Sequence, residues 1–399
     1  MYHGDMKKTF NIVDLFSGCG GFSLGAHLAG YKSLLAVDID PILSSSFKYN
    51  FPDTPLLNAD LGMLPSENLL NAIGDQKIHG VIGGPPCQGF SMMGKRDKND
   101  PRNTLITHFF RHVIALDPDF FIMENVPGLL TSAMKPLLDE AIEAISEKYT
   151  VIKPFVVNAH DYGAATIRKR MVLIGYKPST YRDMTAITFM GNAIKANVRD
   201  AIADLPPPTL DTGFADFEWS KYNEVQPSEY AKKARSLPPK GLGSEIARQK
   251  LAEGFASGFQ NTVHSEVLVR RYGKLESGKS DPISKSKKLD WTKPSNTLRA
   301  GTGREKGAFQ AVRPIHPREP RVITVREAAR LQGFPDWFMF HPAKWHSFRM
   351  IGNSVSPYMS EAILKILAEN AIQNEVHSTQ LQCPHLLVGQ QLAYAVQQS

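Results

Sequence analysis

The first part of the chain alternates short apolar runs with longer amphipathic stretches. The short runs are rich in β-branched and aromatic residues and predict strands, whereas the longer stretches repeat apolar positions at helical spacing. This alternation predicts a doubly wound α/β fold, in which helices cover both faces of a parallel sheet. The predicted strands are 10–16, 32–39, 80–84, 120–125 and 171–178, and the predicted helices are 23–30, 41–50, 103–116 and 135–148.

The pattern weakens after residue 180. Prolines and glycines interrupt the chain over residues 181–292, and basic side chains gather there in three groups. We interpret this stretch as a second, smaller, loop-rich lobe that can present basic side chains to a phosphate backbone. The alternative is a solvated lobe with ordinary surface lysines. The groups are Lys232, Lys233 and Arg235, then Arg270 and Arg271, then Lys285, Lys287 and Lys288.

Helical patterning returns near the end of the chain. Thr324 can cap a helix over 324–334, and Glu327 completes a capping box with it. A further helix is predicted over 356–372. The Gln-rich tail beyond it is weakly patterned, which predicts disorder over 374–399.

The amino-acid composition indicates which class of partner and which cellular compartment to expect. The chain has 399 residues, of which 42% are apolar, and a formal net charge of +7 that favours a polyanionic partner such as nucleic acid. Its three cysteines, Cys19, Cys87 and Cys383, are odd in number and far apart, which argues against a disulfide framework and against a metal site. No signal peptide or membrane-spanning run is visible. We therefore expect a cytoplasmic protein without a bound metal.

A glycine-rich turn follows the first predicted strand, in DLFSGCGGFSLG. A strand, such a turn and a helix together bring a nucleotide-like ligand against backbone N–H groups, although the spacing is not GxGxxG. Asp38 lies at the tip of the second strand, where it can accept hydrogen bonds from a ribose, and Asp60 can meet an adenine amino group. Each aspartate alone could be a helix cap, and the turn could simply require small residues. Together they favour an adenosine-type cofactor.

The stretch GGPPCQGFS follows another apolar strand. Pro85 and Pro86 stiffen the backbone before Cys87, which places the thiol at the rim of a site, although free cysteines are often small buried hydrophobes. A nucleophilic thiol needs a partner that takes up displaced charge. Glu124, beside Asn125 at a strand end, is a candidate that partial burial could keep protonated. The alternative is a structural carboxylate.

These motifs, in this order, resemble those of the DNA (cytosine-5) methyltransferases of the bacterial modification-enzyme type. The resemblance runs from about Asn11 to Ile372, with a gap in the variable lobe, and includes AVDID, NADL, ENV, TVREAARLQGFP and IGNSV. It implies a Rossmann-like methyltransferase sheet and a smaller DNA-recognition domain. The implied division is a catalytic and cofactor-binding domain over 1–180, a target-recognition domain over 181–292, a return to the catalytic domain over 293–373, and the tail over 374–399.

The resemblance also implies the chemistry. A methyl group passes from S-adenosyl-L-methionine to C5 of a cytosine that is flipped out of duplex DNA. The thiolate of Cys87 adds to C6 of this cytosine and Glu124 acts on N3, because C5 of a pyrimidine is a poor nucleophile unaided. Loss of the C5 proton and of Cys87 then releases the product.

Further residues are assigned by the same resemblance. Arg168 and Arg170, in DYGAATIRKR, occupy the two arginine positions of a motif in which the second arginine holds the base, and the resemblance implies that both are catalytic residues. Thr166 stands where the family usually has a glutamine, and it is shorter. The implied substrate-binding residues are Pro86, Gln88, Ser91, Asn125 and Val126. The implied cofactor-binding residues are Phe16, Ser17, Gly18, Gly20, Gly21, Asp38, Ile39, Asp60, Leu61, Leu105, Asn353 and Val355.

Two other functions on the same fold remain alternatives. An RNA cytosine-5 methyltransferase would share the Cys and Glu chemistry, but the Cys-Phe-Thr element typical of that branch does not occur here. A catalytically silent DNA-binding regulator would not need an intact Cys87 and Glu124. A dehydrogenase function is not supported, because the GxGxxG motif is missing. We expect a monomer that acts on double-stranded DNA without membrane or metal, paired in function with a restriction endonuclease but not in a stable complex.

Overall fold

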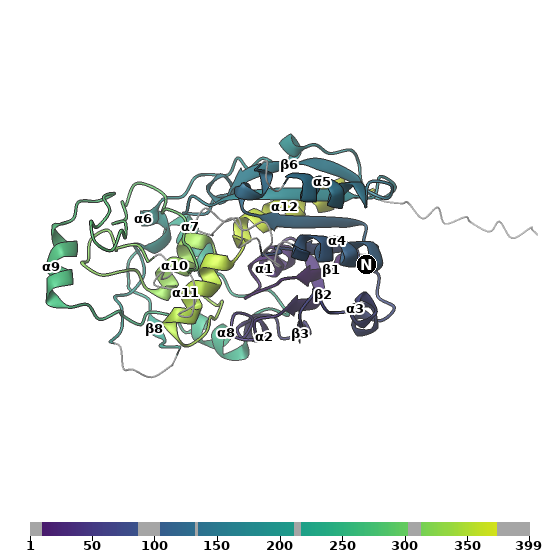
Figure 1. The fold of residues 1–399 in the computed structure, drawn as a ribbon. Helices are drawn as coiled ribbons and strands as arrows, with labels where there is room; N and C mark the ends of the chain where they lie inside the picture. The colour runs from purple at the N-terminus through teal and green to yellow at the C-terminus, as the bar shows by residue number, and fades with distance from the viewer. Residues whose placement is uncertain (1–9, 87–103, 132–134, 211–216, 302–312, 373–399) are drawn as a thin grey trace, which may run out of the picture.

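A seven-stranded sheet organises the larger lobe of the computed structural model, which describes residues 10–86, 104–131, 135–210, 217–301 and 313–372 (Figure 1). The strand order is β3-β2-β1-β4-β5-β7-β6. The strands are β1 (Phe10–Leu15), β2 (Tyr31–Asp38), β3 (Leu56–Asn58), β4 (Gly80–Gly83), β5 (Phe120–Asn125), β6 (Thr150–Asn158) and β7 (Lys169–Tyr176).

The prediction of a wholly parallel sheet is wrong at one edge. Strands β1 to β5 pair in parallel, but β7 runs antiparallel to both β5 and β6. The connection from β6 to β7, residues 159–168, is shorter than the dozen or more residues that a parallel crossover needs. The chain therefore turns back, and β7 begins at the edge of the sheet where β5 ends.

The helix predicted over 41–50 is also wrong for most of its length. Only α2 (Phe47–Asn50) is helical, and turns precede it. The hydroxyl groups of Ser44 and Ser45 donate to the carbonyl oxygens of Asp40 and Ile42. Such serine side chains compete with helical hydrogen bonding and favour turns.

Two layers of helices cover the sheet (Figure 1). On one face, α1 (Gly21–Leu28) and α12 (Pro357–Asn370) pack on Ile12 and Ile82. On the other face, α3 (Ser66–Ile73), α4 (Thr104–Leu116) and α5 (Lys135–Glu143) pack on Val13 and Val81. Adjacent strand residues thus face opposite layers, and the sheet is buried on both sides as a doubly wound sheet requires.

Close packing of α1 on α12 joins the two ends of the described chain. A side chain at Gly25 would place its Cβ 1.8 Å from Oγ of Ser360 and 2.6 Å from the backbone nitrogen of Glu361. Only glycine allows this approach. The segment before α12 consequently lies beside the start of α1, more than three hundred residues away in the chain.

The smaller lobe is built from short elements, and its core is continuous with side chains beside the sheet, such as Leu24 and Phe51. Its aromatic core includes Phe259, Trp337 and Phe338. The elements of this lobe and of the segment that leads back to the sheet are α6 (Val198–Ile202), β8 (Ser220–Lys221), α7 (Glu229–Ala234), α8 (Glu245–Ala252), β9 (Phe255–Ala256), α9 (Glu266–Lys274), α10 (Val325–Gln332) and α11 (Lys344–Asn353). The limits of the predicted domains stay a prediction.

Helix α10 is buried along its whole length despite its charged sequence. The predicted capping box is confirmed, since Glu327 N–H donates to Thr324 Oγ1 and Thr324 N–H donates to Glu327 Oε2. Arg330 donates to the carboxylates of both Asp336 and Asp204. Buried charges of this kind are stable only when paired, and here they join α10 to its surroundings.

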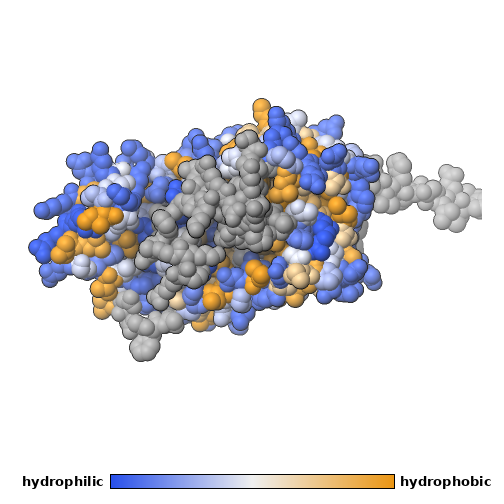
Figure 2. All heavy atoms as spheres, viewed as in Figure 1, coloured by the Kyte–Doolittle hydropathy of each residue, from blue (hydrophilic) through white to orange (hydrophobic). Residues whose placement is uncertain are grey.

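Three of the basic side chains of the smaller lobe have partners within the protein, and the prediction that this lobe can present basic side chains to a phosphate backbone stays a prediction. Arg235 pairs with Asp204 at 2.6 Å, and Arg271 pairs with Asp281 at 2.6 Å. Lys288 is only 6% exposed and donates to the carbonyl oxygen of Leu275. The visible surface of this lobe is nevertheless mainly hydrophilic, with smaller apolar patches (Figure 2).

None of the helices in the described ranges is long and apolar enough to cross a membrane.

Candidate active site

The glycine-rich turn between β1 and α1 has an unusual backbone. Phe16, Gly18 and Gly20 adopt positive φ angles of 66°, 54° and 94°. A bulky residue such as Phe16 rarely adopts a positive φ, and such positions cluster at ligand sites. A Cβ at Gly20 would lie 2.4 Å from the ring of Phe51, whereas a Cβ at Gly18 would meet no described atom within 4 Å. The turn is therefore packed at Gly20 and open at Gly18.

Asp38 ties this turn to the end of β2. Its Oδ2 accepts a hydrogen bond from Gly18 N–H at 2.8 Å, and its Oδ1 accepts one from Asp40 N–H at 2.8 Å. Burial raises the pKa of the Asp38 carboxyl group. Because each carboxylate oxygen has a second lone pair, Asp38 can hold the turn and still accept ribose hydroxyls. Ile39, the next residue, is 61% exposed.

Asp14, at the end of β1, is a candidate that the sequence analysis missed. Its Oδ2 accepts from the hydroxyl of Ser23 at 2.6 Å, while its Oδ1 is buried without a hydrogen-bond partner in the described parts of the chain. Burial raises its pKa to about 7, and the nearby Asp38 adds to this. Oγ of Ser17 is likewise buried and unpartnered among the described residues. The signal was a carboxylate within the apolar end of the run FNIVDLF, between Val13 and Leu15.

The loop after β3 carries Asp60 and is held from α4. Asp60 is exposed, and its Oδ1 accepts from Gly62 N–H at 2.8 Å. The buried Leu61 turns its carbonyl oxygen to Nη2 of Arg111, at 2.8 Å. A Cβ at Gly62 would lie 3.6 Å from the side chain of Leu105, so the structure brings these two predicted regions together.

The junction of α11 and α12 meets the glycine-rich turn from the other side. A Cβ at Gly21 would lie 1.8 Å from Oγ of Ser354 and 2.5 Å from the carbonyl oxygen of Val355. Val355 is 7% exposed and belongs to the core, whereas Asn353 is exposed. The structure thus places Val355 of the IGNSV motif beside the glycine-rich turn.

The loop that leads towards Cys87 begins beside Glu124. A Cβ at Gly84 would lie 3.4 Å from Oε2 of Glu124, and Nδ2 of Asn125 donates to the carbonyl oxygen of Pro85 at 3.0 Å. Pro86 is the last described residue of this loop, and it is partly exposed. The predicted residues Cys87, Gln88 and Ser91 lie outside the described residues.

Glu124 forms an ion pair with Arg170. Nε of Arg170 lies 2.6 Å from Oε1 of Glu124, and both side chains are nearly buried. In the sheet, Glu124 pairs with Val172, two residues after Arg170. The antiparallel direction of β7 thus places an arginine beside the carboxylate at the end of β5. Val126 follows β5, partly exposed, and its N–H donates to Oδ1 of Asn125.

Arg168 lies two residues before Arg170 but faces different partners. It is 1% exposed. Its Nη1 donates to the carbonyl oxygen of Leu298 at 3.2 Å, and its Nη2 donates to that of Gly352 at 3.0 Å. Thr166 is also fully buried, and its hydroxyl donates to the carbonyl oxygen of Asn296 at 3.3 Å. The prediction that Arg168 is catalytic remains untested, and the structure gives it backbone partners.

Cys19, inside the glycine-rich turn, differs from a reactive thiol. It is 3% exposed, and burial raises its pKa to about 12. Its Sγ donates to the carbonyl oxygen of Met350 at 3.8 Å. A buried thiol that stays protonated is a poor nucleophile.

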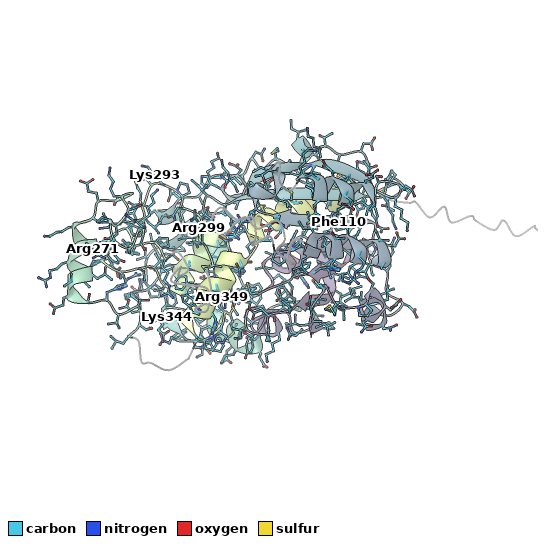
Figure 3. The ribbon with its side chains drawn as sticks, viewed as in Figure 1. Phe110, Arg271, Lys293, Arg299, Lys344 and Arg349 are labelled. Carbon is cyan, nitrogen blue, oxygen red and sulfur yellow. The ribbon has the colours of Figure 1, made fainter. Side chains whose placement is uncertain are left out.

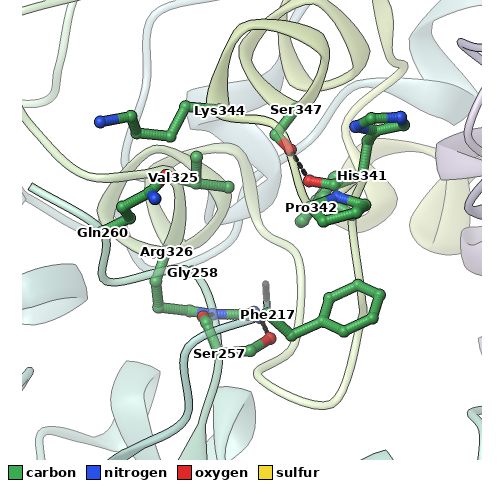
Figure 4. A pocket seen from close by; sticks show the side chains of 11 residues that line it. Phe217, Ser257, Gly258, Gln260, Val325, Arg326, His341, Pro342, Lys344 and Ser347 are labelled. Atoms are coloured by element: carbon green, nitrogen blue, oxygen red, sulfur yellow. Dashed lines mark hydrogen bonds between the residues drawn. The ribbon is translucent and has the colours of Figure 1, made fainter. Parts of the chain in front are cut away.

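A small hollow in the other lobe lies apart from these residues (Figure 4). It has a volume of about 20 Å³, which is room for about one water molecule. Its lining includes Ser257, Arg326 of α10 and Ser347 of α11. Within the described ranges, no cluster of three or more His, Cys, Asp or Glu side chains could hold a metal ion.

Comparison with known proteins decides the family. The family model for C-5 cytosine-specific DNA methylase matches residues 10–369. The chain belongs to this family. A Type II methyltransferase of Xanthomonas oryzae pv. oryzae, M.XorII, is 40% identical to it over 361 residues, which cover 88% of this chain and 82% of the relative. M.DdeI of Desulfomicrobium norvegicum is 33% identical over 377 residues, 88% of this chain and 87% of the relative.

Solved structures agree with the fold. A crystal structure described as a DNA modification methyltransferase encoded within an E. coli prophage superimposes with a TM-score of 0.81 at 40% identity, over 90% of this chain and 99% of that one. The S. pombe Dnmt2 methyltransferase superimposes with a TM-score of 0.58 at 16% identity, over 90% and 98%, and shows the fold alone. These comparisons confirm the Rossmann-like methyltransferase fold and the family. They also confirm the enzyme class, which is DNA cytosine-5 methyltransferase.

The hydrogen-bond acceptors of this C-5 methylase suit the cofactor on which its family depends. S-adenosylmethionine carries a ribose, an adenine amino group and an ammonium group, all hydrogen-bond donors. The described turn offers acceptors without partners at Asp14 Oδ1 and Ser17 Oγ, and further lone pairs on Asp38. Open space at Gly18 leaves room for a ligand at the backbone. The residues therefore fit the group.

Proposed function

We propose that this chain methylates C5 of a flipped cytosine at a specific site in double-stranded DNA, through a transient covalent bond to Cys87. One observation carries the proposal. The Glu124–Arg170 ion pair lies directly beside Gly84 and Pro85, which begin the loop that contains Cys87. A carboxyl group and a thiol at one strand edge are the two groups that cytosine activation needs.

The cofactor would lie along the glycine-rich turn. S-adenosylmethionine supplies the methyl group from its sulfonium centre. Asp38 would accept the ribose hydroxyls, and Asp60 would accept the adenine amino group. Leu61, Leu105, Phe16 and Val355 would line the pocket, and Asp14 Oδ1 is available for the ammonium group. Ser17, Gly18, Gly20, Gly21, Ile39 and Asn353 would complete it.

The target base would lie between Cys87 and Glu124. The Cys87 thiolate forms a bond to C6, and Glu124, in its protonated form, donates a hydrogen bond or its proton to N3 as electron density shifts towards C5. After C5 has gained the methyl group, a base removes its proton and the C6–S bond breaks, which regenerates the thiolate. Arg170 would hold the base and keep Glu124 oriented, because its guanidinium group already contacts that carboxylate.

The smaller lobe would choose the cytosine. We propose that residues 181–292 recognise the DNA sequence, that residues 1–180 and 293–373 form the catalytic domain, and that Pro86, Gln88, Ser91, Asn125 and Val126 contact the DNA or its flipped base. The relatives named Type II methyltransferases support a role as a bacterial modification enzyme. We propose that it acts in the cytoplasm as a monomer and that a restriction endonuclease shares its site without a stable complex.

The test is Cys87→Ser. We expect transfer of labelled methyl groups to unmethylated, PCR-amplified genomic DNA to fall by a thousandfold or more, because a hydroxyl is a far weaker nucleophile than a thiolate (roughly 4 kcal/mol at the transition state). Affinity for S-adenosylmethionine, measured by isothermal titration, should stay within about twofold. Cys383→Ser is the matched control and should keep full activity.

Near-normal transfer by the Cys87→Ser variant would contradict the covalent mechanism. Transfer to RNA in place of DNA by the unmodified enzyme would contradict the substrate. Bisulfite sequencing of DNA from cells that express the chain gives the recognised site and the modified base.

A further inference from the structure

Arg168 is the point at which three distant segments of the chain meet. It follows Thr166 and Ile167, whose backbone pairs with Ser295: Ile167 N–H donates to the carbonyl oxygen of Ser295 at 2.8 Å. Its guanidinium group then joins Leu298 to Gly352, through Nη1 and Nη2. These residues belong to the segment just before β7, to the segment that carries Arg299, labelled in Figure 3, and to the end of α11.

On one side, Arg168 adjoins the groups proposed to act on the base. Burial lowers its pKa well below the ordinary value, Arg170 lowers it further, and Glu124 opposes the shift. Arg170, two residues further along the chain, contacts Glu124 at 2.6 Å, and so Glu124 lies near enough to Arg168 to oppose part of the cost of its buried charge. A buried guanidinium group without a nearby counter-charge would be strongly destabilising, so the positions of Arg168, Arg170 and Glu124 depend on one another.

On the other side, Arg168 fixes the segment that flanks the cofactor pocket. A Cβ at Gly352 would lie 2.3 Å from the backbone nitrogen of Ala300, so the two backbones are in direct contact there. Three residues later, the carbonyl oxygen of Val355 would lie 2.5 Å from a Cβ at Gly21 in the glycine-rich turn. A displacement of Gly352 would therefore also move Val355 relative to the glycine-rich turn, on the cofactor side of the site.

We propose that Arg168 is a positioning residue that couples the cofactor side of the site to its target-base side. It touches neither the base nor the cofactor. Its planar fork holds the carbonyl oxygens of Leu298 and Gly352 at a fixed separation, while its charge stays beside the Glu124–Arg170 pair. This inference rests on the proposed function, since it deepens the role of the same site. A lysine cannot replace it, because a single ammonium group lacks the fork geometry that spans two acceptors.

The test compares Arg168→Lys with a matched buried arginine. Arg326 of α10 is also 1% exposed and also donates to backbone carbonyl oxygens, those of Ser257, Pro335 and Phe338, but none of these belongs to the proposed site. Both lysine variants are expected to lose thermal stability. Only Arg168→Lys should also raise the Kd for S-adenosylmethionine about tenfold without DNA, and lower kcat at saturating substrates by about a hundredfold. Arg326→Lys should stay within about threefold on both measures where it is folded.

Two outcomes would overturn the inference. If Arg168→Lys and Arg326→Lys have the same Kd for the cofactor and the same kcat, then the role of Arg168 is purely structural. A loss of kcat with an unchanged cofactor Kd would place Arg168 on the target-base side alone. If Arg168→Lys does not fold, Gly352→Ala displaces the same contact from its other end. This variant should show both the weaker cofactor binding and the lower kcat. Wild-type values of Kd and kcat for Gly352→Ala would also contradict the inference. Absence of DNA methylation by the unmodified enzyme would instead refute the proposed function.

Discussion

Two regions of this protein bury polar or charged side chains, but the regions differ in whether those side chains have hydrogen-bond partners. On α10, Arg330 donates hydrogen bonds from Nε, Nη1 and Nη2 to the carboxylates of Asp336 and Asp204. At the carboxyl edge of the sheet, Asp14 Oδ1 and Ser17 Oγ are buried without partners in the described residues. A network that satisfies itself maintains the fold, whereas unpartnered buried groups suit a ligand. Stability should therefore depend on the first region and cofactor affinity on the second.

The largest expected effect is on the paired network. Asp336→Ala leaves Arg330 with one carboxylate and removes the partner of Tyr222, so the free energy of unfolding should fall by about 3–5 kcal/mol. Denaturant unfolding followed by tryptophan fluorescence measures this. Asp139→Ala is the control, because Asp139 is an exposed carboxylate that also contacts a basic residue, Lys135, and should cost no more than about 0.5 kcal/mol. Equal losses in the two variants would remove the contrast between the regions.

A smaller effect is expected at the edge of the cofactor pocket. Asp60→Ala should raise the Kd for S-adenosylmethionine about tenfold, or 1.4 kcal/mol, since the exposed carboxylate loses its contact with the adenine. DNA affinity, measured by fluorescence anisotropy, should change little. Asp75→Ala removes the same charge from an exposed loop and is the control. An unchanged cofactor titration for Asp60→Ala would show that the pocket lies elsewhere.

The smallest effect tests Asp14 through pH. Its pKa of about 7 in the fold lies above the ordinary 3.8, so between about pH 4 and 7 the folded state keeps a proton that the unfolded state has released. The free energy of unfolding should therefore fall as pH rises through this window and level off above 7. Asp14→Asn is always neutral and lacks this contribution. Between pH 6 and 7 without cofactor, its advantage over the unmodified chain should grow by about 1 kcal/mol.

Urea unfolding at three pH values is the measurement, with Asp139→Asn as the control for the loss of one charge. A difference between Asp14→Asn and the unmodified chain that does not vary with pH would mean that Asp14 ionises in the fold as it does in water.

Local signals in the sequence located much of the site. The strand ends at Asp38 and Glu124 were predicted because apolar runs stop at them, and the capping box of α10 was predicted from Thr324 and Glu327 alone. Strand β6 was missed because Lys153 and Pro154 interrupt its alternation. A proline is tolerated there because β6 is an edge strand, which only the strand order reveals.

The inward direction of Arg168 could not be read from its neighbours. Two arginines two residues apart in a strand ordinarily share an exposed face, yet Arg170 meets Glu124 and Arg168 meets Leu298 and Gly352. Those acceptors are backbone carbonyl groups more than a hundred residues away in the chain. No pattern of residue types encodes such a contact.

The sequence by itself determined the family, the candidate chemical groups and the strand ends that carry them, because glycine turns, caps and apolar runs depend on near neighbours. The tertiary structure decided which of those groups are satisfied and which stay open. It turned β7 antiparallel and so paired Arg170 with Glu124, it brought Val355 to the glycine-rich turn, and it isolated Oδ1 of Asp14. Burial and pairing depend on segments far apart in the chain, and only packing brings those together.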